Sequence, residues 1–429
     1  MKKSIILYLL LFLSISGHAQ KNQIKDDLNL LPEVTYQQIS NTADYNSNYV
    51  LKVKQPIDHN DPSKGFFNQK VYLSHKSFDQ PTVLVTAGYQ ANNNGIYELT
   101  DLLKANQILV EHRFFGESMP DSLNYKYLNL EQATADLHHI KELFKDIYPK
   151  KWVSTGISKG GATTIFYRYF YPNDVDVSVP YVAPINNTFE EPRIYEFLNT
   201  VGTDECRQKI KDFQIQVLKN RDKILPLLKF YSMGAGAKYS YLTIGEAFEY
   251  AVMEYPFSFW QWGASCDEIP SKKASIEDIT KYFIEVCDLT FFSDQSIEKY
   301  NSHYYQAATE MGYYGYETSE FKDLLVDLPT DKNPMALFFT FKMEEPFNGE
   351  ILEKTNKWLK KKGNHIIYIY GGNDTWTASA VPFSSKVDSK WFILKDKHHG
   401  NARIKGMNTS EKEAFISTLE KWLSIKIEH

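Results

Sequence analysis

The sequence is poor in cysteine and has no concentrated positive charge, and both shortages narrow its possible functions. Cysteine occurs at Cys206, Cys266 and Cys287, without a CxxC pair or a Cys/His cluster. We therefore expect no metal and no other cofactor, while an oxidising compartment would permit one disulfide whose pairing the sequence does not specify. The formal charge is −5 and basic residues form no tract, which argues against nucleic acid as a partner.

Long apolar runs are also scarce, apart from one at the N-terminus. There Lys2 and Lys3 precede IILYLLLFLSIS, and residues 17–19 (GHA) offer a cleavage site. This pattern predicts a signal peptide over residues 1–19, which is too short to span a bilayer comfortably. We expect a soluble protein, exported to the periplasm or beyond, with no stable membrane insertion. Its oligomeric state is left open.

Aromatic residues, in contrast, are abundant. Phe, Trp and Tyr make up 15% of the chain, and tyrosine alone occurs 29 times. Such a composition favours extensive burial and aromatic-lined pockets over disorder. Aromatic and acidic residues gather between residues 187 and 345, where helical periodicity replaces strand-like runs. The densest stretch is YSYLTIGEAFEYAVMEYPFSFWQWG.

Short apolar runs that end in loops alternate with helical patterns on both sides of that segment. The runs are PTVLVTAGY, NQILVEHRFFG, KWVSTG, VDVSVPYVAPI, HIIYIYGGND and KWFILKDKHHG. Asn129 and Gln132 form a capping-box signal for one of the helices, and YVLKVKQPIDHNDPSKGFFNQKVYLSH predicts a β-hairpin. The alternation predicts an α/β protein with a largely parallel sheet. We divide the chain into residues 1–19 (signal), 20–186 (first part of the α/β core), 187–345 (helical insertion) and 346–429 (second part of the core).

The segment GISKG, residues 156–160, matches G-x-S-x-G between a predicted strand and a predicted helix. In that context a sharp turn lifts the Ser158 hydroxyl above the sheet, and the helix N-terminus favours developing negative charge. An ordinary glycine turn is the alternative. A phosphate loop is disfavoured, because Lys159 lacks the G-x-x-x-x-G-K-[ST] spacing. Ser158 is therefore the candidate nucleophile.

A serine nucleophile needs a base and an orienting acid, which should follow it in the order acid, then histidine. Asp374 follows the strand HIIYIY, and either His398 or His399 follows the next apolar run. Both positions lie at the carboxyl ends of strands, where the sites of open α/β sheets collect. His112 also follows a strand, but it precedes the serine, so we expect a structural role for it.

An oxyanion hole requires backbone N–H donors. The residue after the nucleophile, Lys159, should supply one donor. The loop after the strand TVLVTAG should supply the other, and we nominate Tyr89, with Gln90 close behind.

Several segments together resemble a known group of enzymes. LVEHRFFGESMP, LEQATADLHHI and GISKGGATTIFYRYFYPNDVD resemble the serine prolyl peptidases related to prolyl carboxypeptidase. The lysine after the serine and QPIDHNDPSKGFFNQKVYLSH are more similar to the bacterial secreted prolyl tri-/tetrapeptidyl aminopeptidases, serine peptidase family thirty-seven. The matches cover about residues 50–185 and resume at GGNDTW and HHGNAR, which is roughly half of the chain.

This resemblance implies an α/β-hydrolase core with an inserted helical cap, and cleavage of peptides after proline near a free N-terminus. It implies Ser158, Asp374 and one of the paired histidines as the catalytic residues. In the prolyl carboxypeptidase pattern two histidines precede an arginine and the first of them is catalytic. Because His398, His399 and Arg403 match that spacing, the resemblance gives a mild preference for His398. An esterase or lipase on the same fold, or a non-catalytic binding protein, are the alternative functions.

Specific recognition of a proline peptide would use two further kinds of residue. A flat aromatic slot selects the proline ring, for which Tyr89, Trp376 and residues 257–262 are candidates. A carboxylate in the insertion would hold the free amino terminus. Three glutamates are available, and helical spacing explains each equally well as part of a solvated face: Glu246, Glu249 and Glu254.

Overall fold

The computed structural model describes residues 23–40 and 44–428, so the predicted signal peptide lies outside the described residues. Nine strands in this described part form one sheet, in the order β1-β2-β3-β5-β4-β6-β7-β8-β9. They are β1 (Val34–Ile39), β2 (Ser47–Pro56), β3 (Phe66–His75), β4 (Thr82–Thr86), β5 (Asn106–Val110), β6 (Trp152–Ile157), β7 (Val177–Tyr181), β8 (Ile367–Gly371) and β9 (Lys390–Leu394).

The sheet is antiparallel at one end and parallel elsewhere. β1, β2, β3 and β5 pair antiparallel in turn, whereas β5, β4, β6, β7, β8 and β9 run parallel. This confirms the predicted hairpin, which is β2 with β3, and the largely parallel sheet. β1 was not predicted, because its sequence VTYQQI is polar and half-exposed at the sheet edge.

Helices cover both faces of the sheet, and alternate strand residues point into the two layers. On one face Val83 and Val85 pack with α2 (Glu98–Leu102) and α12 (Thr409–Leu423). On the other, Leu84 packs with α3 (Leu130–Phe144). Nearby on that face, α4 (Lys159–Phe170) and α11 (Glu350–Lys362) share a cluster with β8. The short all-buried strands are those expected of a sheet covered on both sides.

The predicted cap on α3 is half right. The Asn129 side chain accepts a hydrogen bond from the Gln132 N–H at 2.9 Å. The Gln132 side chain does not close the box; it donates to Asp58 and accepts from the His59 N–H. A long-range contact to the β2–β3 connection thus replaces the local one.

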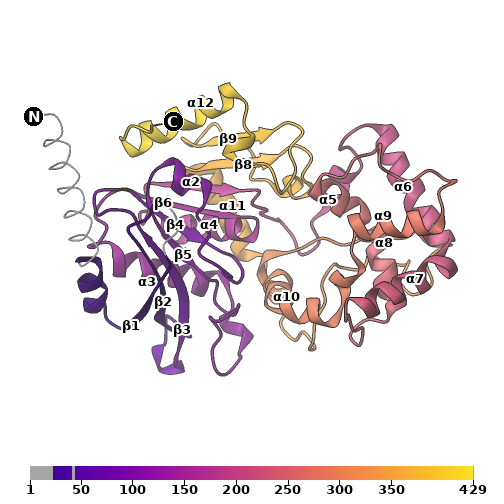
Figure 1. The fold of residues 1–429 in the computed structure, drawn as a ribbon, viewed down its shortest axis with the longest axis horizontal. Helices are drawn as coiled ribbons and strands as arrows, with labels where there is room; N and C mark the ends of the chain where they lie inside the picture. Colours follow the sequence, from indigo (N-terminus) through magenta and orange to yellow (C-terminus); the bar gives the residue numbers. More distant parts are fainter. Residues whose placement is uncertain (1–22, 41–43, 429) are drawn as a thin grey trace, which may run out of the picture.

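A helical insertion occupies the chain between β7 and α11 and forms the right-hand half of Figure 1. Its helices are α5 (Pro192–Leu198), α6 (Asp204–Lys219), α7 (Arg221–Gly234), α8 (Ile244–Trp262), α9 (Ile276–Val286) and α10 (Asp294–Gln306). They share one apolar cluster, which Trp376 of the sheet half also joins. A disulfide joins Cys206 of α6 to Cys266 after α8, and Cys287 is buried and unpaired.

The EHRFFGES segment after β5 supports the loop that follows β4. The buried Glu111 carboxylate accepts from the Ala91 N–H at 2.8 Å, and the His112 N–H donates to the Tyr89 carbonyl at 3.1 Å. The fully buried Arg113 makes two bonds of 2.7 Å to Asp136 on α3. The side chains of Glu111 and Arg113 and the backbone N–H of His112 thus fix the position of the β4 loop.

No helix in the described part of the chain combines the length and the apolarity needed to cross a membrane. In the same ranges, no cluster of His, Cys, Asp and Glu side chains has an arrangement able to hold a metal ion.

Candidate active site

Ser158 stands at a sharp turn between β6 and α4. Its backbone has φ 57° and ψ −124°, a conformation that costs on the order of 1–3 kcal/mol for a residue with a side chain. The Ser158 N–H donates to the Tyr181 carbonyl on the adjacent strand at 2.9 Å, which holds the turn against the sheet. A Cβ built on Gly160 would overlap the carbonyl oxygen of Thr86, so glycine is required there. The geometry is that of a nucleophile elbow.

Asp374 and His399 meet beyond the ends of the next two strands. The His399 Nδ1 lies 2.8 Å from the Asp374 Oδ2, and both side chains are buried. The other carboxylate oxygen of Asp374 accepts from the Trp376 N–H at 3.1 Å, at the start of the short helix η6 (Thr375–Ser379). The His399 N–H donates to the Gln261 carbonyl at 3.0 Å, which ties this loop to the insertion. The carboxylate thus fixes which ring nitrogen of His399 faces away from it.

His398 has different neighbours. Its backbone N–H donates to the Asn401 Oδ1 at 2.7 Å, and its ring Nδ1 accepts from the Gly400 N–H at 3.2 Å. The half-buried ring lies against Gly263 at the end of α8. Partial burial lowers the pKa of His398. The contact with Asp374 therefore belongs to His399, and the preference for His398 drawn from the Arg403 spacing does not match the geometry.

The two proposed oxyanion donors lie on facing segments. Lys159 begins α4, and Tyr89 lies in the loop after β4 that the EHRFFGES segment supports. Within the described residues, no hydrogen bond uses the N–H of Tyr89 or that of Lys159. Both amides thus keep a free donor beside the elbow.

One cavity of about 750 Å³ brings these groups together between the sheet and the insertion. The sheet half contributes Tyr89, Ser158, Lys159, Trp376 and His399, and the insertion contributes Glu254, Trp262, Tyr300, His303, Tyr313 and Tyr314. Asp374 lies behind His399, fully buried. In the described part of the chain no hydrogen bond joins Ser158 to His399; the two residues share the wall of the cavity.

The structure sorts the aromatic candidates into lining and packing residues. Tyr89, Trp262 and Trp376 line the cavity. Phe257 instead stacks on Tyr314 with ring centroids 4.0 Å apart and belongs to the core of the insertion. Tyr313, Tyr314 and His303 also line the cavity and were not predicted, because no local pattern shows which side of an insertion faces the sheet.

The three glutamates are sorted in the same way. Glu246 accepts from the Thr243 N–H and closes the capping box of α8. Glu249 is buried and paired with Arg221, and it also accepts from three consecutive backbone amides, 326–328. Glu254 lines the cavity, and burial raises its pKa to about 7. Two of the three therefore have structural roles, and one faces the site.

Glu254 is held by hydroxyl groups. Its carboxylate accepts from the Ser258 Oγ at 3.0 Å, the Tyr314 OH at 2.9 Å and the Tyr316 OH at 2.7 Å. Hydroxyls orient a carboxylate without neutralising it. Glu254 is therefore a buried acid whose charge a cationic group in the cavity would stabilise.

Comparison with known proteins gives the family. Residues 18–426 match the model of the PS-10 peptidase S37 family. The chain is 29% identical over 391 residues to the prolyl tri/tetrapeptidyl aminopeptidase of Streptomyces mobaraensis, covering 88% of this chain and 80% of that protein. It is 30% identical over 180 residues to the lysosomal Pro-X carboxypeptidase of Homo sapiens, covering 36% of each.

Solved structures resemble the fold more distantly. The proline iminopeptidase of Mycobacterium smegmatis superposes with a TM-score of 0.38 at 11% identity, covering 87% of this chain and 97% of that one. The sheet order, the elbow and the inserted helices are those of an α/β hydrolase with a helical cap. With the family model spanning nearly the whole sequence, the chain belongs to the PS-10 peptidase S37 family and is a serine-type peptidase.

Proposed function

We propose that the protein is an exported exopeptidase that cleaves peptides after proline near a free N-terminus, with Ser158, His399 and Asp374 as its catalytic residues. The observation that carries the proposal is the Asp374–His399 hydrogen bond of 2.8 Å on the cavity that also contains the strained Ser158. His399 takes the place of His398 as base, because an orienting carboxylate contacts its ring. A missing serine–histidine bond is compatible with this role, since such bonds often form only with substrate present.

The reaction would proceed by acyl transfer. The Ser158 Oγ attacks the carbonyl carbon of proline while the His399 Nε2 takes its proton, and Asp374 stabilises the resulting imidazolium. The oxyanion is held by the N–H groups of Tyr89 and Lys159. Collapse of the intermediate breaks the peptide bond, and His399 returns the proton to the leaving amine. Water, activated by the same histidine, then releases the acyl group as a carboxylate.

The substrate class is argued from the cavity walls. A proline ring has no N–H, so it leaves no donor unpaired against the aromatic side chains of Tyr89, Trp262 and Trp376. Glu254 supplies the carboxylate for a protonated N-terminus. The distance along the cavity between Glu254 and Ser158 would set the number of residues released. The activity named for the Streptomyces relative, a prolyl tri/tetrapeptidyl aminopeptidase, agrees with this assignment.

Export is proposed from the signal pattern in residues 1–19 alone. Sequencing the N-terminus of the protein recovered from the culture medium or periplasm of its host tests it. Cleavage after residue 19 is the expected result, and an intact, cytoplasmic N-terminus would contradict export.

The catalytic proposal is tested with a panel of anilides and a covalent probe. We expect hydrolysis of tri- and tetrapeptide anilides ending in proline, weak activity on their N-acetylated forms, and little on short-chain esters. A fluorophosphonate should label Ser158 in the folded protein. Preference for the esters would indicate an esterase, and an unlabelled Ser158 in active protein would refute the assigned nucleophile.

A further inference from the structure

The side chain of Lys159 has a contact that the catalytic residues do not explain. It leaves the elbow, is 2% exposed, and reaches the loop after β4, where its Nζ donates to the Gly88 carbonyl at 2.8 Å. Gly88 has φ +75°, and a Cβ there would overlap the backbone of Gly160, so the loop and the elbow are in close contact at this point. The ammonium therefore connects the two segments that flank the oxyanion site.

The carbonyl that Lys159 binds belongs to the same peptide unit as the Tyr89 N–H. A peptide unit is planar and trans, so fixing the direction of its C=O fixes the direction of its N–H. A cation on the carbonyl oxygen also polarises the amide and makes the N–H a better donor. We propose that Lys159 is a positioning residue whose side chain orients and polarises the Gly88–Tyr89 peptide for the oxyanion. This rests on the proposed function, which assigns that N–H to the oxyanion.

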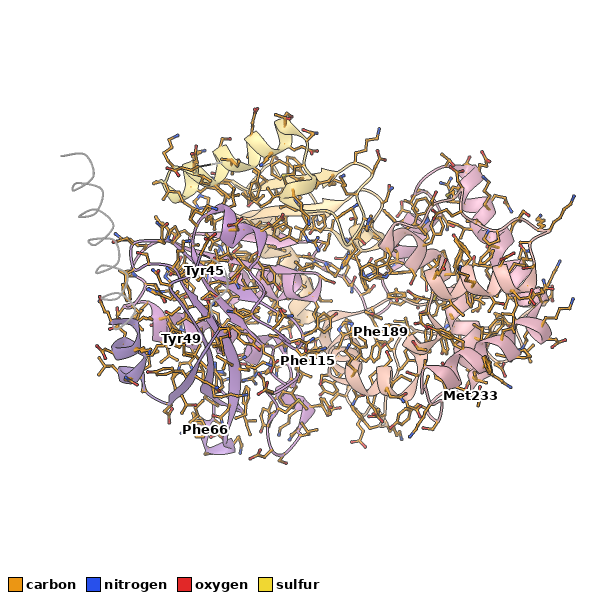
Figure 2. The ribbon with its side chains drawn as sticks, in the orientation of Figure 1. Tyr45, Tyr49, Phe66, Phe115, Phe189 and Met233 are labelled. Carbon is orange, nitrogen blue, oxygen red and sulfur yellow. A yellow bond between two sulfur atoms is a disulfide. The ribbon has the colours of Figure 1, made fainter. Side chains whose placement is uncertain are left out.

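The surroundings of the ammonium hold it in place. Its Nζ lies 5.5 Å from the centroid of the Tyr89 ring and 5.0 Å from that of Phe115, and both faces attract a cation. Phe115 lies on the side of the sheet half that faces the insertion (Figure 2). The charge thus has one strong acceptor, the Gly88 carbonyl, and two weaker ones.

Burial makes this lysine costly to the fold. Desolvation lowers its pKa to about 7, against the opposite effect of Glu310. The buried imidazole of His112 and the half-buried one of His303 lie in the same region. An apolar side chain of the same length would fill the space without that cost. A buried cation beside the nucleophile, bonded to the oxyanion loop, is therefore better explained by catalysis than by stability.

Lys159→Met tests the inference, because methionine matches the four-atom apolar stem of lysine and removes the ammonium. We expect kcat on a proline anilide to fall roughly 10- to 100-fold with KM changed less than about threefold, since one oxyanion donor is misaligned rather than deleted. A peptide boronate, which forms a tetrahedral anion on serine, should lose affinity by the same factor as kcat. The product peptide ending in proline should bind as before.

Two controls separate this role from a structural one. Rates are expressed per active site titrated with the fluorophosphonate, so that unfolded molecules do not count. Arg168→Met removes another buried cation, one that binds the carbonyls of Asp176 and Asn364 at the far end of α4. It should lower the melting temperature and leave kcat per site and boronate affinity unchanged. If the methionine variant does not fold, Lys159→Gln replaces it, because glutamine keeps a shorter, neutral donor. Its kcat and boronate affinity should also fall, but by a smaller factor.

The outcomes are distinguishable. Unchanged kcat and boronate affinity in the Lys159 variants would overturn the inference while leaving the proposed function intact. A fall in kcat without a matching fall in boronate affinity would also overturn it, because the side chain would then act elsewhere than on the oxyanion. Failure of the proposed function itself shows in the wild type, as an unlabelled Ser158.

Discussion

The sheet half and the helical insertion line the same cavity but contribute different chemistry to it. The sheet half places the proposed catalytic residues at strand ends and at a helix start. The Ser158 N–H bonds to the Tyr181 carbonyl, and Asp374 accepts from the Trp376 N–H and contacts His399. The insertion contributes aromatic rings and the carboxylate of Glu254. This division means that changes in the sheet half should alter the chemical step for every substrate. Changes in the insertion should alter which peptides are accepted.

The largest effect is expected at the elbow. Ser158→Ala should lower kcat by roughly 10⁴- to 10⁶-fold on free and N-acetylated anilides alike, because the nucleophile serves every substrate. Steady-state rates on both anilides, with circular dichroism as the folding control, measure it. A loss confined to one substrate would contradict the division between the halves.

The paired histidines give a matched test within the sheet half. His399→Ala should cost roughly 10³- to 10⁴-fold or more in kcat, and Asp374→Asn about 10⁴-fold, because the ring would lose its correct tautomer. His398→Ala, one residue away and without the Asp374 contact, should change kcat less than about tenfold. Equal losses at the two histidines would show that the observed contact does not identify the base.

The same division explains how far the sequence predicts the site. Ser158 and Asp374 follow from local patterns, since strand, turn and helix signals lie within a few residues of each. The histidine pair could not be resolved, because the choice depends on Asn401 and on Gln261, far away in α8. The β1 strand was missed, since half-exposed polar strands have no clear pattern.

The insertion was predictable as a helical segment and no further. Its amphipathic patterns indicate which side of each helix is buried, but not whether that side meets another helix or the cavity. Glu249 and Glu254 illustrate this, because both are buried acids on α8. Only the tertiary structure shows that Glu249 pairs with Arg221 and that Glu254 lines the cavity. The Lys159 side chain was missed for the same reason: its acceptor, Gly88, is 71 residues away.

A moderate effect is expected from Glu254 in the insertion. Glu254→Gln keeps the shape and removes the charge that a substrate ammonium would meet; the hydroxyls that face the new amide nitrogen would accept from it instead of donating. We expect KM for free-amino peptides to rise roughly 10- to 100-fold, as for a lost buried charge pair, with N-acetylated peptides unaffected. Glu246→Gln, at the capping box, is the control and should change neither value.

The pH dependence of that selectivity follows from the raised pKa. Burial raises the pKa of Glu254 to about 7, so the free enzyme carries the charge above that pH and loses it below. KM for free-amino peptides should therefore rise as the pH falls through 7. The ratio of kcat/KM for free over acetylated peptides isolates this effect from any pH dependence of the chemical step, which is common to both substrates. A ratio that stays constant from pH 8 to pH 5 would rule Glu254 out.

The smallest effect on activity, and a sizeable one on stability, is expected from the disulfide. Cys206 and Cys266 are 60 residues apart, both in the insertion, and closing such a loop stabilises the fold by about 4 kcal/mol in the chain-entropy model. Reduction, or Cys206→Ser, should lower the urea midpoint of the insertion while the catalytic residues on the sheet stay in place.

At 25 °C and without denaturant, kcat should then change less than about twofold, because the reactive groups are supported by the sheet rather than by the bridge. Unfolding followed by tryptophan fluorescence, with and without reductant, measures the stability change. Cys287→Ala is the control, since this buried thiol lies in the same insertion but outside the disulfide. Reductant should lower the urea midpoint of this variant as much as that of the wild type. A large fall in kcat on reduction would show that the insertion also holds the reacting groups in register, and the two halves would then act as one catalytic unit.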